Sequence, residues 1–328
     1  MKIPHAQLDA NENPYGPSPK AILAVASAIR DVSRYPRGSK ALEVEIASSL
    51  GVEPDGVIAA AGGDRAIELA LRCLSRSAKR LLIPVPSFRM YENISSAVGL
   101  DATFCKVPTT GYDGLLEEVR EGDLVVLGSP NNPDGKVVER DILEALLKKC
   151  SWLIIDEAYT EYDRTSFAGL TTKYPNLLVI RTFSKAFGLA GLRVGYLVAS
   201  VDATKSIRPL TGPYEVSSIA IEACMACLDD PLYYDRIIEL TCENRSELLK
   251  ALGEIEGIRA MPSHGNFILL RLLRGDASEA WAALRRRNVF VRNCLDWRGL
   301  EEGHLRVSVG TRSELDLFVS SLGEVLGA

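Results

Sequence analysis

The sequence predicts an α/β fold with a mainly parallel sheet, followed by a smaller α+β region. Between residues 56 and 200, short apolar runs alternate with helical stretches or turns, which is typical of parallel strands joined by crossover helices. Polar residues directly follow five of these runs, where the carboxyl ends of parallel strands would meet. The length of 328 residues exceeds the size at which one core usually divides, which predicts one large and one small domain.

The N-terminal region is predicted to be an extended arm followed by two helices. Residues 1–20 are rich in Pro, Asn and Gly, which favours extended backbone and turns. Residues 21–32 and 40–52 each place apolar side chains on one face of a helix, and Gly51 is the expected end of the second. A short strand then enters the glycine turn at residues 62–63.

The rest of the chain is predicted to divide into a region of buried strands and a mixed region. After a helix at 64–75, buried runs typical of strands occur at 80–86, 102–108, 124–130, 152–159, 177–184 and 193–200. A long amphipathic helix at 230–255 precedes strands at 267–273, 289–294 and 304–310 and helices at 278–288 and 313–326. This change of pattern places a domain boundary between residues 205 and 235. We therefore expect an arm and small-domain segment at 1–30, a large domain at 31–215 and a small α+β domain at 216–328.

Composition and charge argue against several classes of function. A net charge of −5 provides no basic surface for nucleic acid and no polybasic membrane patch. The N-terminus lacks the apolar core of a signal peptide, and no apolar run approaches ~20 residues. Three histidines argue against a His-based metal site, and Cys224 and Cys227 are expected to be packed core thiols. We expect a cytoplasmic protein with no metal and no nucleic-acid or membrane partner.

Five predicted strand ends converge on one crevice. Any one of these polar segments could be a structural turn, but five together favour a binding site. They are Gly62-Gly63-Asp64-Arg65, Ser87-Phe88, Ser129-Pro130-Asn131-Asn132-Pro133, Asp156-Glu157-Ala158-Tyr159 and Thr182-Phe183-Ser184-Lys185.

Two charged residues in this crevice are unusual for their surroundings. Asp156 follows a buried run, where a carboxylate is costly unless a cation or a donor meets it; a helix cap or an internal ion pair would also explain it. Lys185 lies in an apolar stretch, and on its own it would be assigned to the surface with its stem along apolar groups. In an apolar crevice, a lysine is suited to bond covalently to an aldehyde and to carry a proton.

An anion site is predicted at the glycine turn. Gly62 and Gly63 precede a helix whose free N–H groups would cradle an anion, although a Gly-Gly pair is more often only a turn. Arg193 can add a fork of donors. The segments GGDRAI and GSPNNPDGK match neither the dinucleotide-binding motif nor the P-loop. A lysine, a buried carboxylate and a phosphate cradle are together what pyridoxal phosphate requires, which makes it the hypothesised cofactor.

The motifs of the chain resemble those of the class I and II, fold-type I, pyridoxal-phosphate aminotransferases, and most closely the histidinol-phosphate aminotransferase branch. The run from SPNNP through DEAY to SKAFGLAGLRVGY is highly specific. The resemblance implies a large domain with a mainly parallel mixed sheet flanked by helices, and a smaller α+β domain. The matching segments occur in family order over nearly the whole chain: LDANENPYGPSP, RYP, GGDRAIEL, PVPSFRMY, SPNNPDG, DEAYTEY, RTFSKAFGLAGLRVGY, GNFILL and HLRVSVGT.

The resemblance also implies roles for the residues at the strand ends. Lys185 is the lysine that bonds to the cofactor aldehyde and moves the proton, and Asp156 pairs with the pyridine nitrogen. Tyr159 and Asn132 hydrogen-bond the 3′-oxygen of the ring, and Phe88 stacks on its face. The phosphate is bound by backbone N–H groups of Gly63, Asp64 and Arg65 and by the side chains of Thr182, Ser184 and Arg193.

Four further residues match positions that contact the substrate or a partner subunit. Arg306 matches the arginine for the substrate anion, whereas strand alternation alone would place it on the solvent face of an edge strand. Arg292 and Tyr15 match residues at the substrate end. Tyr35 matches a residue that reaches the phosphate of the neighbouring subunit in a homodimer.

The implied activity is transfer of an amino group from L-histidinol phosphate, or from another amino acid, to 2-oxoglutarate, as in histidine biosynthesis. Two alternatives stay open: a threonine-phosphate decarboxylase of cobalamin synthesis, and a non-catalytic binding protein, against which the intact set of site residues argues. Three residues depart from the family pattern: Asp134 replaces a usual threonine, Phe88 a frequent tyrosine and Arg65 a common acidic residue.

Overall fold

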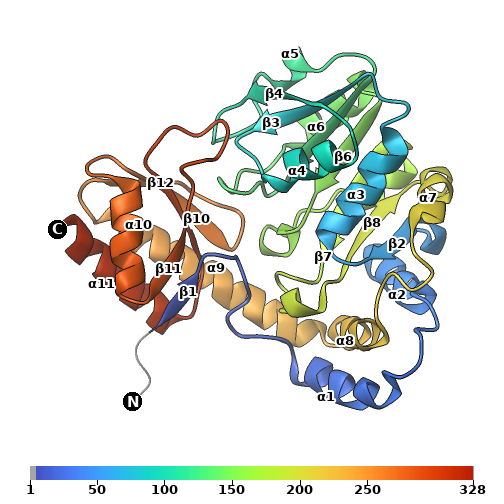
Figure 1. Cartoon of the computed structure of the whole chain (residues 1–328), viewed down its shortest axis with the longest axis horizontal. Coiled ribbons are helices and arrows are strands. Elements are labelled where there is room, and N and C mark those ends of the chain that lie inside the picture. The colour runs from blue at the N-terminus through green and yellow to red at the C-terminus, as the bar shows by residue number, and fades with distance from the viewer. Residues whose placement is uncertain (1–4, 328) are drawn as a thin grey trace.

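The computed structural model describes residues 5–327 and contains two sheets, each covered by helices (Figure 1). We call the seven-stranded sheet with its helices the large lobe, and the five-stranded sheet with its helices the small lobe. The large sheet has the order β2-β8-β7-β6-β5-β3-β4, and the small sheet has the order β1-β11-β12-β10-β9. The predicted α/β class with a smaller α+β part is confirmed.

The large sheet is mixed but mainly parallel. From β7 to β4 all neighbours run parallel, while β8 lies antiparallel between β7 and β2. Central strands such as β5 and β7 are buried along their whole length, which explains their continuous apolar sequences. The strands are β2 Val57–Ala60, β3 Arg80–Val85, β4 Ala102–Lys106, β5 Asp123–Gly128, β6 Trp152–Asp156, β7 Leu177–Thr182 and β8 Gly195–Ala199.

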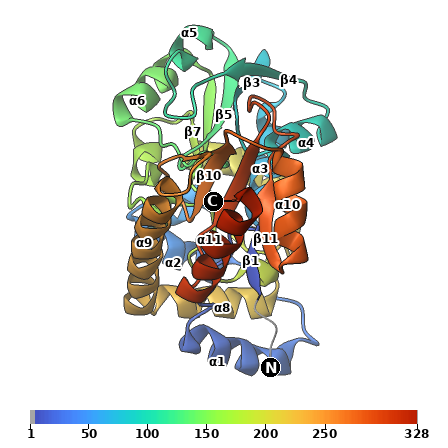
Figure 2. The same ribbon diagram turned by 90° about the vertical axis from the view of Figure 1, so that its left-hand side faces the viewer.

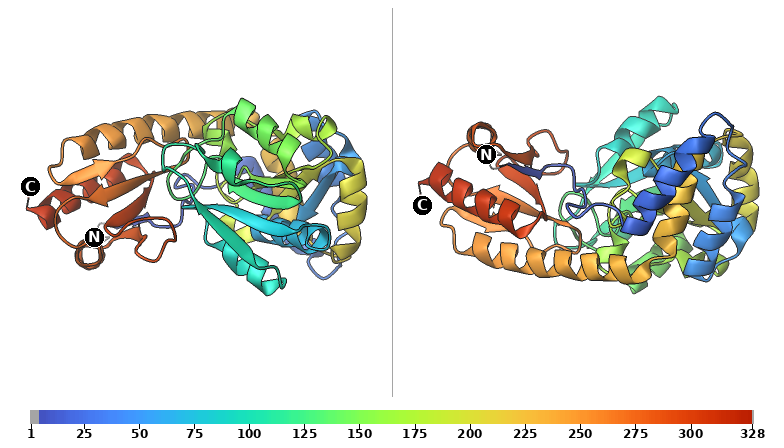
Figure 3. Two further views of the ribbon diagram at one scale, coloured as in Figure 1. Left: turned by 90° about the horizontal axis from the view of Figure 1, so that it is seen from above. Right: turned by 90° about the horizontal axis from the view of Figure 1, so that it is seen from below.

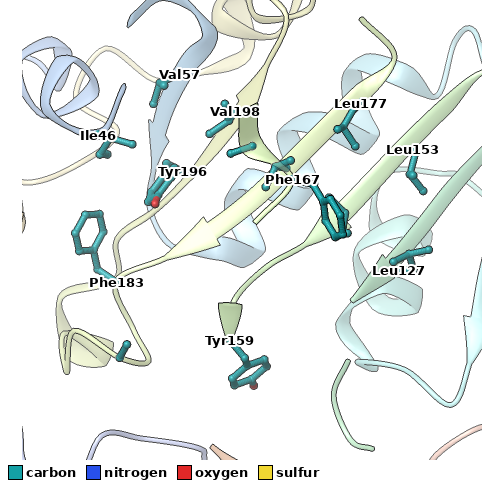
Figure 4. Close-up of a cluster of buried hydrophobic side chains, with 14 of the residues drawn as sticks. Ile46, Val57, Leu127, Leu153, Tyr159, Phe167, Leu177, Phe183, Tyr196 and Val198 are labelled. Atoms are coloured by element: carbon teal, nitrogen blue, oxygen red, sulfur yellow. The ribbon is translucent and has the colours of Figure 1, made fainter. Parts of the chain in front are cut away.

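Helices cover both faces of the large sheet. Side chains of α3, α4 and α7 form the core on one face, and those of α1, α2, α5, α6 and α8 form the core on the other. In the second core the rings of Phe183 and Tyr196 lie 5.7 Å apart (Figure 4). The helices are α1 Pro19–Ala28, α2 Lys40–Leu50, α3 Gly63–Leu74, α4 Met90–Ala97, α5 Leu115–Glu118, α6 Arg140–Lys149, α7 Val201–Ile207 and α8 Ser218–Leu228.

Short 3-10 turns complete the large lobe. Gly51 ends α2 in a left-handed conformation, as the sequence predicted. The predicted helix at 21–32 is divided into α1 and a 3-10 turn. These turns are η1 Ile29–Asp31, η2 Pro54–Gly56, η3 Thr160–Tyr162, η4 Ala168–Thr172, η5 Ala190–Leu192 and η6 Arg208–Leu210.

The small lobe uses both ends of the chain. The arm contributes β1, which pairs in parallel with β11, while the other neighbours in this sheet are antiparallel. Figure 2 shows α10 and α11 in front of this sheet. Residues 1–4 of the predicted arm lie outside the described residues. The elements are β1 Ala6–Leu8, β9 Ile258–Ala260, β10 Phe267–Leu272, α10 Ala277–Arg286, β11 Val289–Asn293, β12 His304–Ser308 and α11 Arg312–Leu326.

A long helix, α9 (Pro231–Gly253), connects the lobes and runs along one side of the molecule (Figure 3). The preceding helix, α8, buries Cys224 and Cys227 in the core of the large lobe. The domain boundary at residue 216 stays a prediction, and the packing of α8 favours a division further along the chain, within α9. Among residues 5–327, no helix combines the length and the apolar character needed to cross a membrane.

Candidate active site

A cavity of about 300 Å³ lies where the strand ends of the large sheet face β12 and the N-terminal arm. Its lining brings together side chains from distant parts of the sequence. Of the predicted site residues it contains Gly63, Asp64, Phe88, Asn132, Asp156, Tyr159, Thr182, Ser184, Lys185, Arg193, Arg292 and Arg306. A larger cleft of about 670 Å³ also lies between the lobes, but none of the predicted site residues lines it.

The Lys185 ammonium is held at the edge of this cavity. Lys185 follows β7, and its Nζ donates a hydrogen bond to the backbone oxygen of Ala10 at 2.9 Å. The same nitrogen lies 5.7 Å from the centre of the Tyr159 ring. Its acceptor belongs to the arm, so the arm holds the lysine without a carboxylate partner among the described residues.

Asp156 is a buried carboxylate at the carboxyl end of β6. It accepts hydrogen bonds from the Tyr91 hydroxyl at 2.8 Å and from the backbone N–H of Ala158 at 3.0 Å. Burial raises its pKa to about 6, and these two donors lower the pKa in part. The carboxylate is therefore poised to gain stability from a cationic N–H placed in the cavity.

A hydrogen-bond network joins the arm to both lobes. The amide nitrogens of Asn11 and Asn132 lie 3.1 Å and 3.5 Å from the Tyr159 hydroxyl oxygen. The Arg306 guanidinium donates to the Asn132 side-chain oxygen and to the backbone oxygen of Asp9, both at 2.6 Å. The network fixes the two amide nitrogens and the Tyr159 phenol around the same part of the cavity.

Arg306 is buried within the site. In β12, Leu305 and Val307 enter the core of the small lobe, and Arg306 points the other way, toward the cavity. Its guanidinium lies 5.6 Å from the Trp297 ring, and its Nε has no hydrogen-bond partner among residues 5–327. Arg292 is its neighbour across the strands β11 and β12. Two arginines therefore present positive charge to one end of the cavity.

The N-terminus of α3 lines the cavity from the large lobe. Gly62 has a φ of 96°, and a Cβ there would lie 2.8 Å from an Arg193 guanidinium nitrogen. The positive φ favours glycine, and a side chain at this position would also have to move the end of the Arg193 side chain. The Thr182 and Ser184 hydroxyl oxygens lie 3.0 Å apart beside the helix start. Free N–H groups, hydroxyls and a guanidinium together suit a phosphate.

Three predicted site residues have side chains outside the cavity. Arg65 is ion-paired with Glu215 at 2.9 Å and with Glu68 at 3.0 Å, which leaves only its backbone near the helix start. The Tyr15 hydroxyl accepts a hydrogen bond from Asn244 at 2.9 Å. Tyr35 is 77% exposed and stacks on Tyr214, with ring centres 4.4 Å apart.

Among the lining residues that were not predicted as site residues, three make the side-chain contacts described above. Asn11 has a φ of 54°, is buried, and donates a hydrogen bond to the Tyr159 hydroxyl. The sequence shows the motif that contains Asn11 but does not predict this hydrogen bond. Tyr91 was part of a quoted motif, with no sign that it would meet Asp156. Trp297 lies in the loop between β11 and β12, where the sequence shows no pattern.

The neighbour of Asp156, Glu157, lies in a buried cluster beneath the site. It accepts hydrogen bonds from the Ser166 hydroxyl and from the Phe167 backbone N–H, both at 2.6 Å. Burial raises the pKa of Glu157 to about 7, and the charge of Arg181 opposes this rise. Glu157 does not line the cavity, so its effect should be on stability.

We expect Glu157→Gln to change how stability depends on pH. Between the ordinary pKa of 4.5 and the raised value of about 7, the folded chain holds a proton that the unfolded chain has released. The wild type therefore loses stability as pH rises through this window, and the variant escapes that loss. The melting temperature of the variant minus that of the wild type should rise from about pH 5 to about pH 7.5. A difference that does not change with pH would contradict this.

Comparison with known proteins identifies the family. A family model described as aminotransferase class I and II matches residues 4–322. The chain belongs to this family. Aminotransferase chemistry can account for the lysine, the buried carboxylate and the candidate anion site described above.

Individual relatives of this aminotransferase match over nearly their whole length. The histidinol-phosphate aminotransferase of Symbiobacterium thermophilum is 34% identical over 98% of this chain and 90% of its own. That of Roseiflexus castenholzii is 36% identical over 97% of this chain and 89% of its own. Among solved structures, the Sinorhizobium meliloti histidinol-phosphate aminotransferase in complex with pyridoxal-5′-phosphate matches with a TM-score of 0.87 and 25% identity, covering 100% of this chain and 92% of that one.

Proposed function

We propose that this aminotransferase uses pyridoxal phosphate to transfer an amino group from L-histidinol phosphate to 2-oxoglutarate, in histidine biosynthesis in the cytoplasm. The observation that carries the proposal is one cavity that contains a lysine, a buried carboxylate, a helix N-terminus and two arginines. The relatives named above support the choice of amino donor.

The residues of the cavity fit the proposed cofactor. The absence of a side chain at Gly62 leaves an open helix N-terminus beside Arg193, which suits a phosphate. Asp156 is buried and already accepts two donors, so it suits a protonated ring nitrogen. When bound, pyridoxal phosphate supplies an aldehyde for covalent attachment and a ring that withdraws electrons.

The chain's own groups divide the work of binding and proton transfer. Asp156 would hold a proton on the ring nitrogen, and Tyr159 with Asn132 would hydrogen-bond the ring oxygen. Phe88 would cover the face of the ring. As a neutral amine, the Lys185 Nζ would accept a proton from the substrate carbon that bears the amino group and would return it to the former aldehyde carbon of the cofactor, because Nζ already stands at the edge of the cavity.

The two arginines would bind the anionic end of each substrate. Arg306 uses two of its five N–H donors on Asn132 and Asp9, which leaves donors for a carboxylate or a phosphate. The Arg292 guanidinium has no hydrogen-bond partner among the described residues and would add charge for the doubly charged phosphate. One end of the cavity can thus serve both half-reactions.

We expect Arg306→Lys to weaken both half-reactions. An ammonium keeps the positive charge but loses the planar fork that holds a carboxylate or a phosphate with two hydrogen bonds. The KM for each substrate should rise ~10-fold or more. Stopped-flow measurement of each half-reaction separately checks this.

Arg292→Ala should slow the half-reaction with histidinol phosphate more than the half-reaction with glutamate. Equal slowing of both half-reactions would count against the proposed donor.

We also propose a homodimer in which each subunit completes the site of the other. Tyr35 stacks on Tyr214, and the large lobe exposes further apolar side chains on α1 and in the segment after it, which a second copy would cover: Ile22, Leu23, Ile29 and Val32.

Mixing subunits tests this dimer. We expect Tyr35→Ala and Lys185→Ala proteins to be impaired separately and to regain activity when unfolded together and refolded, because a hybrid dimer would contain one intact site. Sedimentation measures the oligomeric state alongside activity. A dilute monomer with full activity, or a mixture no more active than its parts, would refute the shared site.

A panel of substrates tests the proposed reaction itself. The wild type with bound cofactor is mixed with L-histidinol phosphate, with aromatic and aliphatic amino acids, and with threonine phosphate. We expect histidinol phosphate to change the absorption spectrum of the bound cofactor. We also expect glutamate to form from 2-oxoglutarate. Release of carbon dioxide from threonine phosphate without amino transfer would replace the proposal by the decarboxylase alternative.

A further inference from the structure

A fully buried ion pair lies within the loop that carries Asn132. The Lys136 ammonium is 3.0 Å from an Asp134 carboxylate oxygen, and the side chains are 1% and 0% exposed. The ammonium also donates to the Pro108 backbone oxygen at 3.0 Å and lies 4.9 Å from the centre of the Tyr112 ring. Neither residue lines the cavity of the proposed active site.

Stability alone is a weak reason for such a pair. Removing two charges from water is costly, and apolar residues of similar volume often stabilise a core equally well. A second reason is needed for a buried carboxylate and ammonium beside an active site, and the hydrogen bonds of Asp134 supply it.

Asp134 fixes the residue next to Asn132. Its Oδ1 accepts a hydrogen bond from the Asn131 side-chain nitrogen at 2.7 Å. The backbone N–H of Asn131 donates to the Lys136 backbone oxygen at 2.7 Å, which closes the loop. Asn131 is thereby held through its side chain and its backbone. The following residue, Asn132, receives the 2.6 Å hydrogen bond from Arg306.

The same loop contacts the small lobe at a second point. The backbone N–H of His264 donates to the Gly135 oxygen at 2.9 Å. Gly135 has a φ of 72°, and a Cβ there would lie 2.8 Å from the Ser263 Cα, so the two backbones are in close contact. Residues 131–136 therefore meet the small lobe at Arg306 and at Ser263–His264, with the ion pair between these contacts.

We propose that Asp134, held in place by Lys136, is a positioning residue that acts through Asn131 and Asn132 to orient the Arg306 guanidinium for the substrate anion. The proposal rests on the role of Arg306 in the proposed function. Asp134 does not touch substrate. It fixes the position of the Asn132 side-chain oxygen, which accepts the hydrogen bond from Arg306. Loss of this alignment should weaken binding of anionic substrates more than it slows their conversion.

Two matched double variants isolate the positioning contact. Asp134→Asn/Lys136→Met removes both charges but keeps an oxygen for Asn131, whereas Asp134→Leu/Lys136→Met removes both charges and the acceptor. We expect the first to keep the wild-type KM within ~3-fold and the second to raise the KM for both substrates ~10-fold with little change in kcat. A control at the far end of the sheet, Arg80→Met/Asp123→Leu, removes another largely buried pair and should leave KM unchanged.

A double-mutant cycle with Arg306→Lys separates positioning from a general loss of structure. If Asp134 acts through Arg306, the Leu/Met variant should add little to KM in the Arg306→Lys background. Additive effects, or equal KM values in both double variants, would overturn the proposal. An Arg306→Lys protein with unchanged KM would instead refute the assigned role of Arg306. Should the Leu/Met variant not fold, Asn131→Leu removes the same hydrogen bond, together with the one that Asn131 donates to the Pro86 backbone oxygen, and carries the same expectation.

Discussion

Replacement of Lys185 by alanine is expected to abolish turnover, with a rate loss of ~10⁴-fold or more. The amine has two proposed duties, covalent attachment of the cofactor and transfer of the substrate proton, and no nearby group can assume either. Lys185 lies beside the Tyr159 ring and the backbone oxygen of Ala10, neither of which is a base. The loss should therefore exceed that of any other single substitution in the site.

Two measurements make the Lys185 prediction specific. The variant should lose the visible absorption of a lysine-linked cofactor while it keeps the melting temperature of the wild-type protein without cofactor, since Lys185 makes one hydrogen bond to the arm. Lys205→Ala, at an exposed lysine, is the matched control and should behave as the wild type. Near-normal turnover by Lys185→Ala would exclude the assigned chemistry.

The strand-end residues could be predicted from the sequence because topology brings them together. Parallel strands share one carboxyl edge, so Asp156 at the end of β6 and Lys185 after β7 had to lie close once both runs were recognised as strands. The class I and II aminotransferase family and the α/β fold are likewise confirmed. The assigned roles of the individual residues stay predictions.

Contacts made by irregular segments could not be predicted in the same way. Asn11 reaches Tyr159 across 148 positions of sequence, from an arm with no periodicity to fix its direction. Trp297 is placed by a loop whose course depends on packing between the lobes. The three-residue strand β9 is too short to leave an alternating pattern, and it was missed. Arg306 shows the converse limit: alternation correctly separated it from Leu305 and Val307, but the solvent face of an edge strand was wrong, because β12 lies between β11 and β10 and Arg306 is buried.

Replacement of Asp156 by asparagine is expected to reduce the rate on the order of 100-fold, since the loss of a charge-assisted hydrogen bond to a buried partner costs about 3 kcal/mol. The substitution changes charge more than shape. An asparagine oxygen can still accept from the Ala158 N–H, and the Tyr91 hydroxyl can reverse to accept from the new amide. What is lost is the negative charge that would keep a proton on the cofactor ring.

Tyr91→Phe is the matched comparison for the Asp156 prediction. It removes a donor that lowers the pKa of Asp156, so that pKa should rise further while the carboxylate itself stays in place. At alkaline pH, where the carboxyl is ionised, Tyr91→Phe should keep most of the rate, and Asp156→Asn should stay impaired at every pH. The measurement is the single-turnover rate of each half-reaction between about pH 6 and about pH 9, with cofactor affinity determined separately. Equal and pH-independent losses in the two variants would show that hydrogen bonding, and not charge, is what Asp156 provides.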